Sequence, residues 1–86
     1  MATNNNTEVT FEIMEHIGVI DTYPNRDQAW TKEVNIVSWN GADAKLDIRN
    51  WHPGRARSGK GITLNQDETL ALYEALNSIF SFENDL

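Results

Sequence analysis

Two kinds of side chain gather between residues 39 and 64 of this chain. The segment holds Trp39 and Trp51, which are two of the three tryptophans, and five of the seven lysines and arginines. Tryptophan rings stack on other flat rings, and lysine and arginine attract phosphate and other anions. The segment therefore favours binding of an anionic ligand that carries aromatic rings, although such surfaces also bind other anions and acidic proteins.

Charge is distributed unevenly along the chain. The formal net charge is −6, and this value taken alone argues against nucleic acid as a ligand. Residues 1–29 carry −4 and residues 66–86 carry −5, whereas residues 30–65 carry +3. Acidic ends around a basic middle are compatible with nucleic acid, because the ends repel the phosphates from the wrong faces.

Single-stranded nucleic acid is the ligand class that fits this pattern best. Its bases are free to stack on aromatic rings, at roughly 1–3 kcal/mol per base. Trp39 and Trp51 are the candidate stacking residues. The candidate phosphate contacts are the six basic residues of the middle part of the chain, Lys32, Lys45, Arg49, Arg55, Arg57 and Lys60.

No motif in the sequence favours catalysis. There is neither a Gly-x-Ser-x-Gly nor a His-Glu-x-x-His pattern, and residues 58–61 lack the leading glycine and the trailing Ser or Thr of a P-loop. Cysteine is absent, and His16 and His52 do not have the spacing of metal ligands. We expect a non-enzymatic protein with no metal, no cofactor and no small-molecule substrate.

A protein-interaction module is the alternative function. Such a module would use the apolar C-terminal helix or an open edge of the sheet. It would explain the apolar stripe of the helix, but it would leave the basic, tryptophan-bearing segment without a purpose.

Length and hydropathy predict one soluble domain. A chain of 86 residues forms a single small core and buries only roughly 60% of the surface that its unfolded chain exposes. Its apolar runs are too short for a membrane span or a signal peptide, so we expect a cytoplasmic protein without membrane contact. Residues 1–7 are polar and predict a disordered lead-in, and residues 8–86 form the single domain.

Alternating apolar residues predict three long strands. Residues 8–20 alternate clearly, and the polar residues 21–29 suit a hairpin connection. Residues 30–39 form a second strand, rich in β-branched and aromatic side chains. Asn40-Gly41 predicts a tight turn into a third strand over residues 45–51.

The remaining elements are a loop, a short strand and a helix. Residues 52–61 contain a proline and three glycines, which favours a mobile basic loop. Residues 62–64 form a short fourth strand, and Asn65 is the N-cap of a helix in which Glu68 completes a capping box. The order is β-β-β-β-α, and the fold class is α+β.

Strand parity divides the side chains between two faces of the sheet. The predicted core side carries Val34 and Ile36 from the second strand and Leu46 and Ile48 from the third. Trp39, Arg49 and Trp51 then share the opposite face, which we expect to be exposed and available to a ligand.

The helix carries an apolar stripe that is wider than one small sheet can cover. The stripe consists of residues at helical spacing, Leu70, Tyr73, Leu76, Ile79 and Phe80, and it is widened by Leu72, Ala75 and Phe82. We therefore expect the helix to pack on its own sheet and also on a second copy of the chain.

Residues 34–65 resemble one particular family. VNIVSWNG, then LDIRNW, then a basic glycine-rich loop that ends in GKGITLN, resemble the single-stranded-DNA-binding domain of the transcriptional coactivator p15, also called positive cofactor four. The short bacterial members are the most similar, and the resemblance covers roughly residues 11–80. It implies a homodimer of curved four-stranded antiparallel sheets, each followed by one helix, that binds single-stranded DNA, or RNA, with little sequence preference.

The resemblance also implies roles for particular residues. Trp39 matches an aromatic residue that stacks on bases, Arg49 matches an arginine that contacts the backbone, and Lys60 matches a basic position. The second stacking residue is Trp51 or His52, and parity favours Trp51.

The chain also departs from the pattern of the eukaryotic members of that family. It has Asn40 and Ala42 where those members carry lysines, with Lys45 as a possible substitute. Their regulatory tail is missing, so a eukaryotic coactivator role does not carry over. We expect a bacterial, nucleoid-associated protein that acts in transcription regulation or DNA maintenance.

Overall fold

Four strands and one helix follow each other in the predicted order. A computed structural model describes residues 9–21 and 30–80; the predicted lead-in and residues 22–29 of the predicted hairpin connection lie outside them. The elements are β1 (Phe11–Val19), β2 (Thr31–Trp39), β3 (Lys45–Trp51), the short 3-10 helix η2 (Pro53–Arg55), β4 (Ser58–Leu64) and α1 (Gln66–Phe80). The strands form one antiparallel sheet in the order β1-β2-β3-β4, which confirms the predicted fold class.

Asn40 and Gly41 form the predicted tight turn between β2 and β3. Their φ angles are +53° and +78°, and the Ala42 amide donates to the Trp39 carbonyl at 2.9 Å. Positive φ at both central residues gives a turn whose twist matches that of the flanking strands. Beyond this turn, β2 and β3 pair so that Ile36 faces Leu46 and Asn35 faces Asp47.

Strand β4 begins earlier than predicted. It starts at Ser58, so the prediction that the whole of residues 52–61 forms a loop was wrong for its last four residues. The reason is close packing: a Cβ at Gly61 would lie 1.9 Å from the Cβ of Arg49, and one at Gly59 would lie 2.6 Å from a ring atom of Trp30. Glycine is required at both positions because a neighbouring side chain lies directly against the strand. These glycines therefore do not mark the end of a strand or a loop.

Two bulges bend β1. The register to β2 shifts between Ile13 and Glu15 and again between His16 and Gly18. The first shift moves His16 to the face of Asn35, whose Oδ1 lies 2.6 Å from its Nδ1. Strict alternation along β1 would have put His16 on the other face, since alternation carries no information about a bulge.

The sheet curls inward on the face that was predicted to be exposed. We call this the inner face; it carries Asn35, Val37, Trp39, Asp47, Arg49 and Trp51. Val37, Trp51, Asn35 and Asp47 are the most deeply buried of the described residues. The ring of Phe11 on β1 reaches that of Trp51 on β3 at a centroid distance of 4.9 Å, although the two strands are not neighbours in the sheet. The curvature of the sheet therefore shields the centre of this face from solvent, although no helix packs on it.

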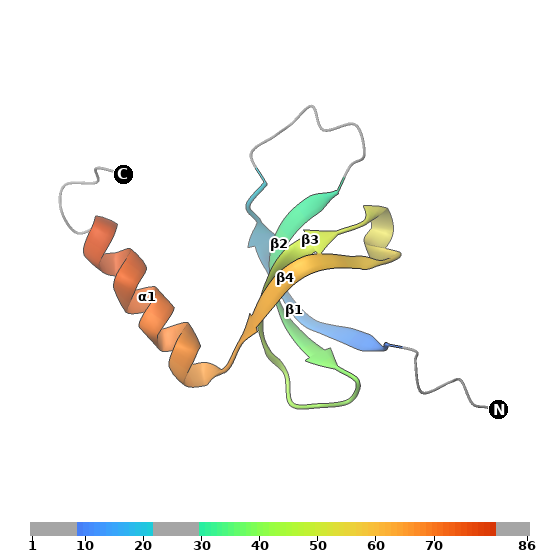
Figure 1. The fold of residues 1–86 in the computed structure, drawn as a ribbon, viewed down its shortest axis with the longest axis horizontal. Coiled ribbons are helices and arrows are strands. Elements are labelled where there is room, and N and C mark those ends of the chain that lie inside the picture. Colours follow the sequence, from blue (N-terminus) through green and yellow to red (C-terminus); the bar gives the residue numbers. More distant parts are fainter. Residues whose placement is uncertain (1–8, 22–29, 81–86) are drawn as a thin grey trace.

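The opposite face, which we call the outer face, carries Val34, Ile36, Leu46 and Ile48. These four side chains are only half-buried, so the prediction that they form the centre of the core was wrong for the single chain. Helix α1 stands off from the sheet and touches it mainly through its first turns (Figure 1). No residue of Gln66–Phe80 is buried.

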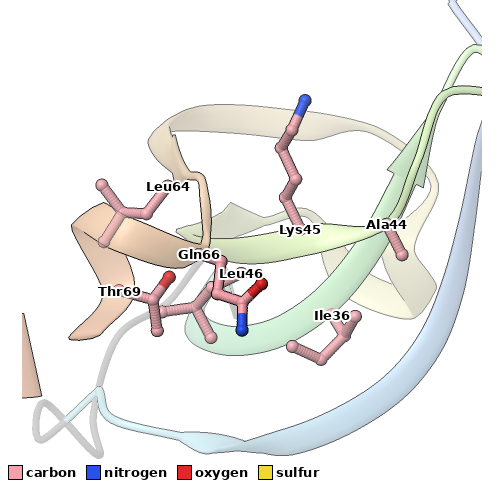
Figure 2. Close-up of a pocket in the computed structure, with 7 residues that line it drawn as sticks. All are labelled: Ile36, Ala44, Lys45, Leu46, Leu64, Gln66 and Thr69. Carbon is pink, nitrogen blue, oxygen red and sulfur yellow. The ribbon is translucent and has the colours of Figure 1, made fainter.

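The start of α1 is fixed by the predicted capping box. The Asn65 side chain accepts from the Glu68 amide at 2.8 Å, and the Glu68 carboxylate accepts from the Asn65 amide at 2.9 Å. Beside this cap lies a hollow of about 260 Å³ between the helix and the ends of β2, β3 and β4 (Figure 2). Leu46 points into it, whereas the Lys45 side chain extends to the other side of the strand.

Gly61→Ala should destabilise the protein by roughly 1–3 kcal/mol, because the new methyl group would overlap Arg49 and push β4 away from β3. Chemical denaturation would measure the loss. Gly18→Ala is the control, since a Cβ there meets nothing within 4 Å. Equal stability of the two variants would contradict the close approach of Arg49 to β4.

Candidate nucleic-acid interface

The carboxylate of Asp47 organises the inner face. It is fully buried and accepts hydrogen bonds from Trp39 Nε1 at 3.0 Å and Thr63 Oγ1 at 2.8 Å. Arg49 Nε and Nη2 donate to its two oxygens at 2.7 and 2.9 Å, which makes the pair bidentate. One buried charge thus joins side chains from β2, β3 and β4.

Arg49 is held rigidly over Trp39. Its Cζ lies 4.7 Å from the centre of the Trp39 ring, within the range of a cation–π contact. Beyond the two bonds to Asp47, Nη1 donates to the Gly59 carbonyl at 3.1 Å and Nη2 donates to Thr63 at 3.3 Å. Among the described residues, four of the five guanidinium N–H groups are therefore occupied. Arg49 offers a ligand its charge, its flat face and one donor.

The aromatic residues of the inner face form a cluster. The rings of Trp39 and Trp51 are nearly parallel, with centroids 5.9 Å apart, and Phe11 contacts both of them. Trp39 is half-buried, but Trp51 is 0% exposed, so the prediction that Trp51 is exposed was wrong. Parity placed Trp51 on the correct face, and the curvature that brings Phe11 over it was not visible in the sequence.

Trp51 also differs from Trp39 in how it is anchored. Within the described residues, Trp51 Nε1 is the buried side-chain atom without a hydrogen-bond partner, whereas Trp39 Nε1 is bound by Asp47. Trp51 is thus held by apolar packing beneath the site, and Trp39 is held by a polar contact at its border.

A second buried carboxylate, that of Glu33, fixes the basic loop after β3. It accepts from Asn35 Nδ2 at 3.1 Å, from Thr31 Oγ1 at 2.9 Å and from Arg55 Nε at 3.0 Å. Burial raises the pKa of Glu33, but the three hydrogen bonds and the charge of Arg55 outweigh it, so the net pKa lies below its ordinary value. Arg55 has a φ of +56°, a strained conformation that this ion pair helps to maintain.

Two shallow hollows lie side by side on the inner face. The first, of about 300 Å³, is lined by Val9, Trp39, Asn40, Arg49, Ser58 and Thr63. The second, of about 280 Å³, is lined by Val9, Phe11, Ala56, Arg57 and Ser58. Because they share Val9 and Ser58, they form one depression that runs from the Trp39–Arg49 pair to Phe11 and Arg57.

The structure distributes the predicted contact residues over several places. Trp39, Arg49 and Arg57 border the depression, whereas Arg55 is already paired with Glu33 at 3.0 Å. The remaining predicted residues lie elsewhere: Lys45 is exposed at the hairpin end of β3, Lys60 is exposed on β4, and Lys32 and His52 fall on the outer face.

Trp30 belongs to this region although the sequence did not indicate it. Its ring meets the His52 ring edge-on at 4.6 Å and covers Gly59. Trp30 is the first residue of the predicted second strand and lies outside the basic segment, so the sequence analysis gave it no functional role. Gly59 in a short Gly-Lys-Gly strand was the available signal, since such glycines often mark close approach of another group.

A curved antiparallel sheet with a braced tryptophan–arginine pair and a basic loop defines a small binding domain. Residues 26–75 match the family described as Transcriptional Coactivator p15 (PC4), and the chain belongs to this family. It is a nucleic-acid-binding, non-enzymatic family whose members bind single-stranded DNA.

A relative from Treponema pallidum (strain Nichols), described as an uncharacterized protein, is 38% identical over 74 residues. The aligned part covers 86% of this chain and 84% of that protein. This short relative agrees with the predicted similarity to short bacterial members.

The described residues contain no group of three or more His, Asp or Glu side chains that could hold a metal ion. In the same part of the chain, no helix has the length and apolar character needed to cross a membrane.

The Glu33 network should make the protein sensitive to acid. Because the pKa of folded Glu33 lies below its ordinary value of 4.5, its ionised form stabilises the fold fully above about pH 5, and this contribution is lost as the pH falls through the lowered pKa. The difference in free energy of unfolding between wild type and Glu33→Gln should therefore shrink between neutral pH and about pH 3. Urea denaturation across this range would measure it, and a difference independent of pH would contradict the network.

Proposed function

We propose that this chain binds single-stranded DNA as a homodimer, with little sequence preference, through the inner-face depression. The observation that carries the proposal is the Trp39 ring, half-buried at the border of the depression and braced by Asp47 and Arg49. A preordered ring loses little conformational freedom on binding, so more of the stacking energy is retained as affinity.

The chemistry of the depression fits a nucleotide. A base can stack on the part of Trp39 that borders the first hollow and on the flat face of Arg49, and Phe11, which is 36% exposed, offers another ring in the second hollow. Arg57 stands beside the second hollow and can neutralise a phosphate. Single-stranded RNA offers the same groups, so it belongs to the same proposal.

The cellular setting follows from the same ligand. A sequence-tolerant single-strand binder suits transcription regulation or DNA maintenance in a bacterial cytoplasm, where single strands arise whenever a duplex opens. We assign the chain to that setting on the strength of its family and its short bacterial relative.

Binding should be visible in tryptophan fluorescence when an oligothymidine is added at low salt. Trp39→Ala should weaken it by roughly 1–3 kcal/mol, because one stacked base is lost. The logarithm of the affinity should fall with the logarithm of the salt concentration at about −0.7 per phosphate neutralised. Asn77→Ala on the exposed helix is the control for effects outside the site. Wild-type emission that does not respond to the oligonucleotide would overturn the proposal.

The dimer is supported by the apolar surface that the single chain leaves open. On α1, Leu70, Tyr73 and Leu76 are 55%, 62% and 45% exposed, and on β4 Ile62 is 53% exposed. Between the helix and the outer face lies an apolar groove of about 390 Å³, lined by Ile17, Val34, Leu46, Ile48, Thr69, Leu72, Tyr73 and Leu76. A second copy of the same chain offers a matching apolar helix, and symmetric pairing is the commonest way to bury such a surface.

Leu76→Glu should convert the dimer to a monomer, because it places a charge in the apolar groove. Light scattering at micromolar concentration would give the mass. Ala71→Glu adds the same charge at an exposed position on the other side of the helix and should leave the dimer intact. A wild-type protein of monomer mass would refute the pairing, and capture of a different protein through this face would favour the interaction-module alternative.

A further inference from the structure

The buried carboxylate of Glu33 lies beside two basic side chains that come from distant parts of the chain. Arg55 Nη2 lies 3.0 Å from Glu33 Oε1, and His16 Nδ1 lies 3.7 Å from the same oxygen. The two basic groups also lie against each other, with 3.3 Å between Arg55 Nη2 and His16 Nδ1. One negative charge therefore faces one permanent cation and one ring that becomes a cation when it is protonated.

The hydrogen bonds of Asn35 fix where His16 takes up a proton. Asn35 Nδ2 donates to Glu33, so Asn35 Oδ1 is the atom that faces His16 Nδ1 at 2.6 Å. An acceptor at this distance requires a hydrogen on Nδ1, which makes Nε2 the unprotonated nitrogen of the neutral ring. The His16 side chain is 44% exposed. A proton taken up at Nε2 thus makes the ring positive while the bond to Asn35 stays in place.

Protonation of His16 changes the balance of charges around Glu33. A positive ring at 3.7 Å attracts the carboxylate, and the same ring at 3.3 Å repels the guanidinium of Arg55. Histidine is the side chain that ordinarily changes charge between about pH 8 and pH 5. Glu33 keeps its negative charge over this range, because its pKa lies below the ordinary value. Arg55 has a strained φ of +56°, so a weaker ion pair also removes part of what holds it in place.

The other charged groups near His16 are directed elsewhere. Asp47 on β3 is fully buried and already bound by Arg49, and Arg57 borders the second hollow. The remaining charged side chains of β1 and β2 fall on the outer face; they are Glu12, Glu15 and Lys32. Within the described part of the chain, the charge of a protonated His16 therefore acts on Glu33 and Arg55.

We propose that His16 is a positioning residue that controls whether Arg55 is available to a phosphate group of single-stranded nucleic acid. Neutral His16 leaves Arg55 paired with Glu33, and protonated His16 pairs with the carboxylate in its place and releases the guanidinium. The inference rests on the proposed function, because the released arginine adds one phosphate contact beside the inner-face depression. Ala56 and Arg57, which follow Arg55 directly, line the second hollow, so the released side chain stays at the border of the same site.

The exchange of partners can be followed without any ligand. Side-chain NMR of the full chain between about pH 8 and pH 5.5 reports both the protonation of the His16 ring and the environment of Arg55 Nε–H. We expect the Arg55 Nε–H resonance to move toward that of the exposed Arg57, with the same midpoint as the His16 ring. In His16→Gln, whose side chain stays neutral, the Arg55 resonance should not move. A wild-type Arg55 resonance that does not follow His16 would overturn the inference and leave the proposed function standing.

The salt dependence of binding gives the second measurement. At about pH 5.5, the logarithm of the oligothymidine affinity of wild type should fall with the logarithm of the salt concentration more steeply than at pH 8, by about 0.7, because one more phosphate is neutralised. This steepening should be lost in His16→Gln. His52→Gln removes the other histidine of the chain and should retain it.

A wild-type slope that is the same at both pH values would refute the release of Arg55, and so would a steepening that survives in full in His16→Gln. If wild type forms no complex at either pH, the proposed function fails, and the NMR titration still decides whether His16 displaces Arg55 from Glu33. Thermal unfolding of each variant at both pH values shows that the compared proteins are folded.

Discussion

The buried carboxylate of Asp47 is the interaction on which the inner face depends. A fully buried charge is tolerated only when it is paired and hydrogen-bonded, and removal of one partner of such a pair costs about 3–5 kcal/mol. Asp47 meets this condition with Arg49, Trp39 and Thr63, which come from three adjacent strands. The same bonds that neutralise the charge therefore fix the tryptophan ring and the guanidinium at the border of the depression.

Glu33 repeats this arrangement where the inner face meets the basic loop. It joins β2 to Arg55, and Asn35 extends the network to His16 on β1. The hydrogen bonds of these two carboxylates lie on the inner face, where they hold the strands and the basic loop in place. The apolar side chains of the outer face line the groove beneath helix α1 instead. The proposed inner-face depression and the proposed pairing surface therefore lie on opposite faces of one thin sheet.

Element order, the Asn40-Gly41 turn and the capping box could be predicted from sequence, because each depends on neighbours within a few residues. Parity also grouped Trp39, Arg49 and Trp51 correctly on one face. It could not tell which face closes, because curvature depends on the bulges of β1 and on glycines in β4 that admit Arg49 and Trp30. When a side chain that is distant in sequence packs against a strand, the sequence shows only a glycine at the contact. The position of Trp30 against Gly59 was missed for this reason.

The bonds of Asp47 also bear on how the site would treat different bases. A base is read through hydrogen bonds to its edge, and this requires free donors and acceptors beside the stacking ring. Here Trp39 Nε1, Thr63 and four N–H groups of Arg49 are bound within the protein, so a base at Trp39 finds a flat ring, a positive charge and one donor. Every base has a face that can stack on the ring, whereas one hydrogen-bond donor is too little to distinguish one base from another. The rigidity that orders the ring thus leaves few free groups that could distinguish one base from another, and the proposed low sequence preference would follow from this arrangement.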